Sequence, residues 1–334
     1  MSLEKTIVIV GSINLDLVIN TETIPAVGQT VTGSELQMHP GGKGANQAVA
    51  VARLGYPVSM IGRVGDDAFG EQLRGYLSSA GVAIDGVSTT RGASGAALIA
   101  VSASGDNSII VAPGANAHVS PDDIDRNLAT IRSAGVVLSQ LEIPLETVEY
   151  LARVCTEAGT PLILDPAPAR QLPSSLFGHI RWFTPNETEA AYYAGIADGQ
   201  AEQDCKRVAK TLLDKGCGGV ILKRGAHGAY LASQHEPAEH IPSFAVNAID
   251  TTAAGDAFNG GFAVGLMKGL SPRDSACLAS AVAAISVTRA GAQTSMPSMH
   301  EVKEFLNDQF AKGVSVPSEF TAFAHHYSAG EDLQ

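Results

Sequence analysis

A regular alternation of short apolar runs and helical stretches in the second half of the chain constrains the fold most. Strands are predicted at residues 136–138, 161–164, 181–183 and 219–222, and helices at 145–157 and 201–215. Short apolar runs are typical of strands that are buried on both faces of a parallel sheet. Because parallel neighbours need crossover connections, which are right-handed, the pattern predicts a doubly wound α/β sheet.

The first third predicts a second, smaller sheet beside the large one. The run at residues 6–10 opens the central sheet, and a helix, a strand and a helix are expected at 45–54, 57–61 and 67–80. Alternating apolar and polar residues predict exposed strands at 15–20, 29–37, 96–101 and 107–111. Long helices follow at 254–268, 272–289 and 299–310, and no clear pattern follows Lys312.

Composition excludes several classes of protein. The chain has 334 residues, 45% of them hydrophobic and 17% charged, which is typical of a folded chain rather than a disordered one. A formal charge of −12 disfavours nucleic acid as a partner. No apolar run reaches 18 residues, so we expect no membrane span and no secretion. Four widely spaced cysteines without a C-x-x-C pattern predict reduced thiols and a cytoplasmic protein.

The common nucleotide and catalytic motifs are absent from the chain. Lys43 is followed by Gly44, so there is no Walker motif, and no G-x-G-x-x-G follows Val10. H-E-x-x-H and G-x-S-x-G are missing as well, and the nine histidines have no ligand spacing. Any catalysis must therefore use other groups.

The segment DTTAAGDAFNG at residues 250–260 stands directly before an apolar helix. Its small residues leave the backbone amides of the first helical turn free to bind an anion, such as a phosphoryl group in transfer. Asp256 lies in that turn, where its carboxylate is able to accept a proton from a hydroxyl. The alternative is that Thr252 or Asp256 only caps the helix.

This segment resembles the second signature of the ribokinase family of carbohydrate kinases. GGKGANQA at residues 41–48 resembles the first signature, and TPNETE at 184–189 resembles the family's N-x-x-E element. The resemblance implies a ribokinase-like three-layer α/β/α sandwich with a mostly parallel sheet and a small β-sheet lid. We expect one kinase domain over 1–312, lid strands from about 15–37 and 96–111, and a tail at 313–334 of uncertain order.

The activity that the resemblance implies is transfer of the γ-phosphoryl group of ATP to the 5-hydroxyl of D-ribose. Kinases of the same family that act on fructose, 2-keto-3-deoxygluconate or adenosine are the alternatives. A catalytically silent sugar-binding protein would have lost the base, whereas Asp256 is present.

Roles of individual residues also follow from the resemblance. Asp256 is the expected base, beside anion-hole amides of Ala253, Ala254 and Gly255. The sugar is expected to contact Asp256 together with Asn14, Asp16, Gly42, Lys43, Asn46 and Glu142. ATP is expected near Asn186, Lys223, Arg224, Gly225, Ala226, His227, Gly228, Gly255 and Ser280. Taken alone, Asn14 and Glu142 are also typical of turn or surface groups, and Gly225 and Gly228 of a hairpin. Lys223 departs from the small hydroxyl residue of many family members.

Two cations and a dimer complete these expectations. Asn186 and Glu189 would act on the Mg²⁺ of Mg-ATP through water, although alone they also fit a helix N-terminus. A monovalent cation, K⁺ or a similar ion, is expected at the carbonyls of Asp250, Thr252, Ser286, Arg289, Gly291 and Ser295. The lid has one apolar face without a core of its own, which favours a homodimer through the lids.

Overall fold

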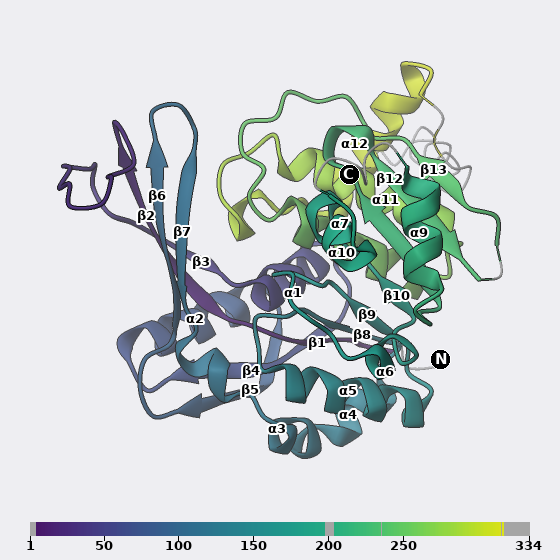
Figure 1. Ribbon diagram of the computed structural model, residues 1–334, viewed down its shortest axis with the longest axis horizontal. Coiled ribbons are helices and arrows are strands. Elements are labelled where there is room, and N and C mark those ends of the chain that lie inside the picture. The colour runs from purple at the N-terminus through teal and green to yellow at the C-terminus, as the bar shows by residue number, and fades with distance from the viewer. Residues whose placement is uncertain (1–4, 198–203, 235, 315, 317–334) are drawn as a thin grey trace, which may run out of the picture.

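The protein is described by a computed structural model that covers residues 5–197, 204–234, 236–314 and 316. Within these residues the central sheet has nine strands, in the order β13-β12-β11-β10-β9-β8-β1-β4-β5 (Figure 1). Its strands are β1 (Ile7–Val10), β4 (Val58–Gly65), β5 (Ala83–Thr90), β8 (Val136–Ser139), β9 (Leu162–Leu164), β10 (Trp182–Phe183), β11 (Gly219–Lys223), β12 (Ala229–Ser233) and β13 (Glu239–Ile241). The pairs β11–β12 and β12–β13 are antiparallel, and the other neighbouring strands that the structure describes in this sheet are parallel.

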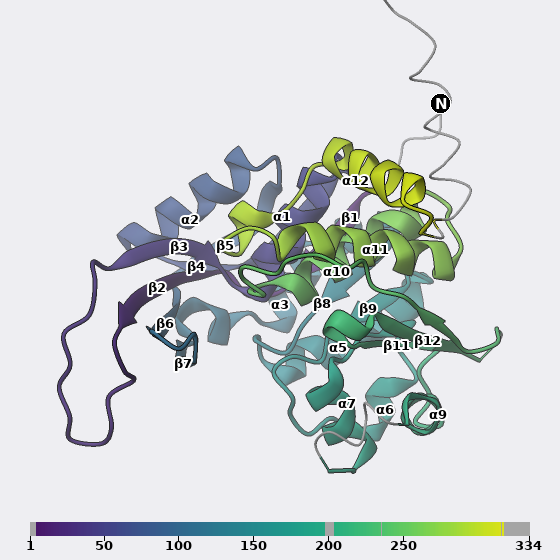
Figure 2. The same ribbon diagram turned by 90° about the horizontal axis from the view of Figure 1, so that it is seen from above.

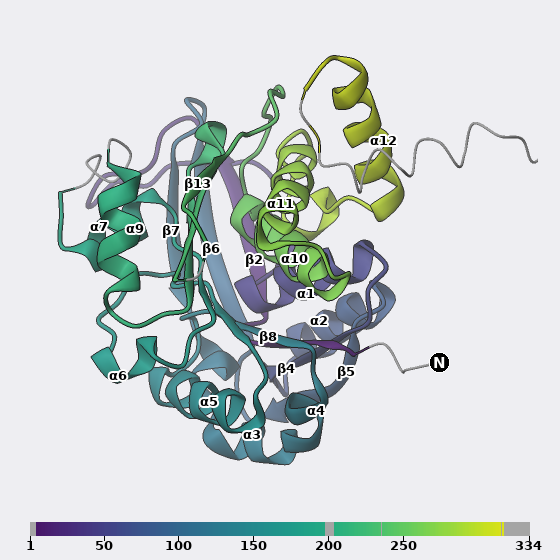
Figure 3. The same ribbon diagram turned by 90° about the vertical axis from the view of Figure 1, so that its right-hand side faces the viewer.

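Helices cover both faces of the central sheet, as Figures 2 and 3 show. One layer contains α1 (Lys43–Arg53), α2 (Ala68–Ser79), α10 (Ala254–Met267), α11 (Pro272–Ser286) and α12 (Met299–Ala311). The other contains α3 (Pro121–Arg126), α4 (Leu128–Ser133), α5 (Leu145–Ala158), α6 (Ser174–Phe177), α7 (Glu187–Ala194) and α9 (Cys205–Leu213) (Figure 3).

The two helical layers meet opposite faces of β1, because successive side chains of a strand point to opposite sides. Ile7 and Ile9 lie in the same apolar core as Phe262 of α10. Val8 and Val10 lie in a second core with Leu151 of α5. The predicted three-layer α/β/α sandwich is therefore confirmed.

A separate four-stranded sheet stands beside this body, at the left of Figure 1. Its order is β3-β2-β6-β7, and its strands are β3 (Gln37–Gly41), β2 (Asn14–Thr21), β6 (Gly95–Ser102) and β7 (Asn107–Ala112). The predicted small sheet is confirmed. Several of its large apolar side chains are exposed, namely Ile19, Met38, Leu98, Ile109, Ile110 and Val111.

Two predictions about strands are wrong. The strand expected at 29–37 lies instead at Gln37–Gly41, and residues 29–36 contain a single bridge from Gly33 to Thr21. Residues 27–36 are almost entirely exposed, so no buried face requires their alternating residues to form a strand. The strand β5 was not expected, because this edge strand is largely polar and lacks an apolar run.

Helix ends differ from the predictions by a few residues. α11 ends at Ser286 instead of residue 289. Residues 201–203 of the helix expected at 201–215, and most of the tail after Lys312, lie outside the described residues. All four cysteines lie among the described residues, and none of them is in a disulfide. Among the helices that the structure describes, none has both the length and the apolar character that a membrane crossing needs.

Candidate active site

The start of α10 lies at the centre of the candidate site. Its N-cap residue Ala253 has a φ of 58°, and no other non-glycine residue in the described part of the chain has a positive φ. Such a conformation is uncommon for alanine and strained. The amides of Ala253 and Gly255 have no backbone acceptor within the described residues, whereas Ala254 N donates to Thr251 O at 3.2 Å. Two of the three amides expected in the anion hole are therefore free to bind an anion.

Asp256 follows in the first turn of α10 and is buried, with 5% of its surface exposed. Two amides of α1 hold its carboxylate: Asn46 Nδ2 donates to Oδ2 and Gln47 Nε2 donates to Oδ1, both at 3.0 Å. Burial raises the pKa of Asp256 to about 6, although Lys43 and the two amides favour the charged form. A carboxylate with this pKa is ionised at neutral pH and is a stronger base than an exposed aspartate.

The groups expected to bind the sugar gather beside Asp256. Burial, with the negative charges of Glu142 and Asp256, raises the pKa of Asp16 to about 6. Glu142 follows β8, and its Oε2 accepts from Ser12 Oγ at 2.6 Å and from Lys43 N at 3.3 Å. Burial would lower the pKa of Lys43, but the surrounding carboxylates raise it above its ordinary value. These charged side chains come from three separate parts of the fold.

Asn14 and Gly42 complete this end of the site. Asn14 Oδ1 accepts from Asn116 Nδ2 at 2.7 Å, which fixes the orientation of the Asn14 amide. Gly42 is the N-cap of α1 with a φ of 87°, and a Cβ there would lie 2.7 Å from Asn14 N. Only glycine allows the backbone to approach this closely. All the residues expected to bind the sugar thus lie near one another.

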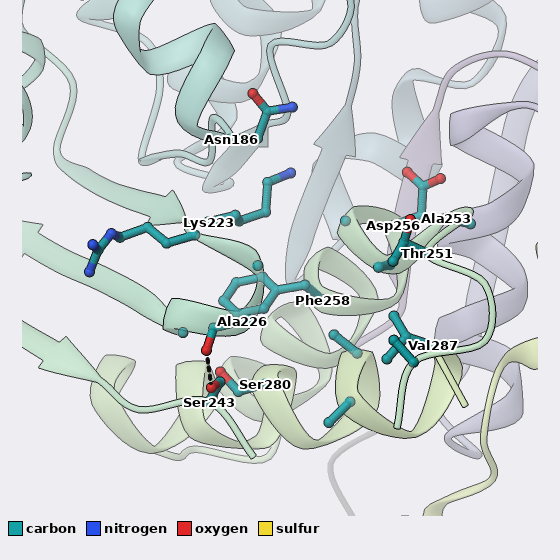
Figure 4. Close-up of a pocket in the computed structure, with 18 of the residues that line it drawn as sticks. Asn186, Lys223, Ala226, Ser243, Thr251, Ala253, Asp256, Phe258, Ser280 and Val287 are labelled. Carbon is teal, nitrogen blue, oxygen red and sulfur yellow. Dashed lines mark hydrogen bonds between the residues drawn. The ribbon is translucent and has the colours of Figure 1, made fainter. Parts of the chain in front are cut away.

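A cavity of about 900 Å³ extends from Asp256 along α10 and α11 (Figure 4). Lys43, Asp165 and Lys223 line the end near Asp256, and apolar groups including Phe258 and Val287 line the remainder. Ser280 lies at the far end, where its buried Oγ has no hydrogen-bond partner among the described residues. The volume and the mixed lining suit a nucleotide-sized ligand.

The turn from β11 to β12 borders this cavity. Arg224 N donates to Gly228 O at 2.8 Å, and Gly228, at φ 80°, packs so closely that a Cβ would lie 2.1 Å from Ile241 O. The segment Gly225–His227 between them is a short 3-10 helix. The hairpin is thus present, and of the residues in this turn, Arg224, Gly225, Ala226 and Gly228 line the cavity, whereas His227 does not.

Asn186 and Glu189 form a capping box at the start of α7. Asn186 Oδ1 accepts from Glu189 N, and Glu189 Oε2 accepts from Asn186 N, both at 2.8 Å. The helix-terminus interpretation is therefore correct for their contacts. Both residues also line the cavity, and burial with the charge of Asp165 raises the pKa of Glu189. The described residues contain no group of three or more His, Cys, Asp or Glu side chains that could hold a metal ion.

The turn before α10 is joined to the chain after α11. Asp250 accepts from Thr252 Oγ1 at 2.6 Å and from Gly291 N at 2.8 Å. Burial alone would raise the pKa of Asp250, but these hydrogen bonds outweigh burial and hold the pKa below its ordinary value. The side chains of Ser286 and Ser295 donate to nearby carbonyls, and Arg289 pairs with Glu301. The residues expected around a monovalent cation therefore lie on two joined segments.

Sequence reasoning missed four residues of the site. Gln47 contacts Asp256, Asp165 contacts Gln47 and Lys223, Asn116 orients Asn14, and Ser12 contacts Glu142. Gln47 lies inside the first signature, and its position one residue after Asn46 was a usable signal. Asp165 directly follows a predicted strand, where ligands of parallel sheets bind.

Comparisons with known proteins agree with this geometry. The family described as pfkB family carbohydrate kinase matches residues 4–299. The chain is 40% identical over 305 residues to a ribokinase of Haemophilus influenzae, covering 91% of this chain and 99% of that one. It is 37% identical over 305 residues to a deoxyribokinase of Salmonella typhi, covering 90% and 98%.

Solved structures give the same result. The structure of Arabidopsis thaliana ribokinase complexed with ribose and ATP has a TM-score of 0.85 and 35% identity, covering 91% of this chain and 99% of that chain. A family match over most of the chain, full-length relatives and a shared fold lead to one conclusion. The chain belongs to the pfkB family of carbohydrate kinases.

Proposed function

We propose that the protein transfers the γ-phosphoryl group of ATP to the 5-hydroxyl of D-ribose, giving D-ribose 5-phosphate and ADP. One observation carries this proposal: the Asp256 carboxylate lies at the free amides of α10, between the polar cluster of Asp16 and Glu142 and the nucleotide-sized cavity. The names of the relatives, ribokinase and ribokinase complexed with ribose and ATP, support ribose as the acceptor.

In the proposed reaction, the sugar hydroxyl attacks the γ-phosphorus while its proton passes to Asp256. A bond forms between the sugar oxygen and phosphorus, the bond to the β-γ bridging oxygen breaks, and ADP leaves. The amides of Ala253 and Gly255 bind the charge on the transferred group, as the free amides of a helix start favour. Positioning and charge stabilisation account for most catalysis of this reaction type.

The sugar would be held by the polar groups around Asp256. Asn14, Asp16, Lys43, Asn46 and Glu142 together offer the donors and acceptors that a polyol requires. Backbone at Gly42 lies close enough to join them.

The nucleotide would occupy the cavity between α10, α11 and the turn from β11 to β12. The Ser280 Oγ, which has no hydrogen-bond partner among the described residues, would supply a polar contact at the far end, and the residues of the turn would border the base and ribose. Lys223 and Asn186 also line the cavity and would lie at the phosphate end.

Two cations belong to the proposal. Mg²⁺ bound with ATP would neutralise phosphate charge, and Asn186 and Glu189 would hold it through water. A monovalent cation, K⁺ or a similar ion, would bind the carbonyls of Asp250, Thr252, Ser286, Arg289, Gly291 and Ser295. The hydrogen bond from Gly291 to Asp250 supports this, because it keeps the two segments together.

The proposal also covers assembly and organisation. The exposed apolar residues of the small sheet support a homodimer through this lid. The four cysteines, which form no disulfide among the described residues, are compatible with a cytoplasmic protein. We further propose that residues 1–312 form one kinase domain and that 313–334 are a tail to it.

A panel of acceptors tests the substrate. ADP release is measured with Mg-ATP and ribose, 2-deoxyribose, fructose, 2-keto-3-deoxygluconate or adenosine, and the position of the phosphate is determined by phosphorus NMR. We expect the highest kcat/KM with ribose and a product phosphorylated at the 5-position. A kcat/KM that is highest for another acceptor would overturn ribose as the substrate, and deoxyribose is a serious alternative because of the Salmonella typhi relative.

A further inference from the structure

A buried carboxylate that the proposed reaction does not use, Asp165, contacts groups on both sides of the site. Asp165 follows β9 and has 2% of its surface exposed. Its Oδ1 accepts from Lys223 Nζ at 2.9 Å, and its Oδ2 accepts from Gln47 Nε2 at 3.1 Å. The same Gln47 Nε2 donates to Asp256 Oδ1 at 3.0 Å. One amide group therefore bridges Asp165 and Asp256.

The orientation of Gln47 is fixed by a further contact. Gln47 Oε1 accepts from Gln140 Nε2 at 2.7 Å, so the amide nitrogen must face the two carboxylates. Each of its two hydrogens then has one carboxylate as acceptor. Through this shared amide group, a change at Asp165 also affects Asp256.

Lys223 reaches the place where the phosphoryl group would be transferred. Its Nζ lies 3.3 Å from where a Cβ on Gly255 would be, next to the free amides at the start of α10. Figure 4 shows its side chain extending toward the space shared with Asn186 and Asp256. The ammonium and the amides thus converge on one point, where an anion would meet both.

The pair of Lys223 and Asp165 is buried, with side-chain exposures of 12% and 3%. Removing two charges from water is expensive, so a buried ion pair contributes little net stability on average. Stability alone therefore does not explain this ion pair, whereas a role in the reaction does.

We propose that Asp165 is a positioning residue for phosphoryl transfer, which holds the Lys223 ammonium at the start of α10 and, through Gln47, the carboxylate of Asp256. In this arrangement Lys223 contacts the transferred phosphoryl group directly and Asp165 does not. The inference rests on the proposed function, because it needs Asp256 as base and the phosphoryl group at α10.

The link between Asp165 and Asp256 should be measurable through the pKa of Asp256, which depends on the charged groups around it. They are Lys43 from α1, Asp16 from β2 and Asp165 after β9, with Lys223 of β11 paired to Asp165. The charge of Asp165 helps to raise the pKa of Asp256. Loss of that charge should lower the pKa of the base, so the acid limb of the kcat profile should move to lower pH.

The test uses Asp165→Asn in the full chain, with kcat, KM for ribose and KM for ATP measured from pH 5 to 9. We expect kcat to fall at least about tenfold, KM for ribose to stay within about threefold, and the acid limb to move to lower pH. Asp214→Asn is the matched control, because it makes the same change in an exposed ion pair with Lys210. Turnover within about twofold of the parent, or a fall without movement of the acid limb, overturns the inference.

If Asp165→Asn does not fold, the Lys223→Gln variant is used instead to test the inference. Gln keeps a donor for Asp165 but removes the ammonium, so kcat should again fall at least about tenfold, and turnover within about twofold overturns the inference. Asp256→Asn is assayed in parallel. A parent without sugar kinase activity overturns the proposed function itself, and an Asp256→Asn variant with unchanged turnover overturns Asp256 as the base of that function.

Discussion

Replacing Asp256, the proposed base, by asparagine should make the protein more stable. Burial raises the pKa of Asp256 from 3.8 to about 6, so the folded state disfavours the ionised carboxylate. At 1.36 kcal/mol per pKa unit this corresponds to about 3 kcal/mol at neutral pH. Asp256→Asn removes the charge, but its amide nitrogen meets one of the donors on Asn46 or Gln47, which costs about 1 kcal/mol.

The net gain of about 2 kcal/mol should raise the melting temperature by about 2–6 °C at pH 8. The pKa of the folded state lies above that of the unfolded state, so the penalty is complete above about pH 6 and absent below about pH 4. The advantage of Asp256→Asn should therefore shrink as the pH falls from 8 to 4.

Differential scanning fluorimetry of the parent and Asp256→Asn across this pH range checks the prediction. Asp214→Asn is again the control, because its exposed carboxylate should give no pH-dependent gain. A melting temperature for Asp256→Asn at or below that of the parent at pH 8, or a gain that does not change with pH, would refute the reasoning.

Three further predictions concern the sugar, the monovalent cation and the lid. Asp16→Ala should lower kcat/KM for ribose by about 10–100-fold, because a hydroxyl of the sugar loses a charged hydrogen-bond partner, and KM for ATP should change little. Unchanged ribose kinetics would show that Asp16 is only a turn residue. Potassium should increase kcat more than sodium, by organising the turn from Asp250 to Gly255, and equal rates in potassium and an organic cation at matched ionic strength would contradict this. Ile110→Asp on the exposed face of β7 should convert a dimer to a monomer in sedimentation experiments, whereas a variant that sediments like the parent would exclude this face as the interface.

The parts of the fold that follow from local patterns were predictable from sequence. Buried runs such as β1 and helices such as α10 each have a periodicity of their own, and the structure has them within a few residues of the predicted ranges. The strand at Gln37–Gly41 was misplaced because its neighbours are exposed, and exposed residues carry no information about register.

The site was predictable in outline only. The motifs identified Asp256 and Asn46, which are 210 residues apart in sequence and form a hydrogen bond. Asp165 has no motif of its own, and its contacts with Gln47 and Lys223 depend on how three strand and helix ends meet. Such long-range contacts are set by the tertiary fold rather than by local sequence.

Turnover of Asp256→Asn with saturating ribose and Mg-ATP tests the central claim, that Asp256 is the general base, most directly. Asn keeps the size of the side chain, and the N-cap of α10 is Ala253 without a side-chain cap, so the start of α10 should be retained. If Asp256 accepts the proton of the sugar hydroxyl, kcat should fall by about 10²–10⁴ while ribose and ATP still bind. A kcat within a few-fold of the parent, on protein that is folded at the assay temperature, would contradict the assignment.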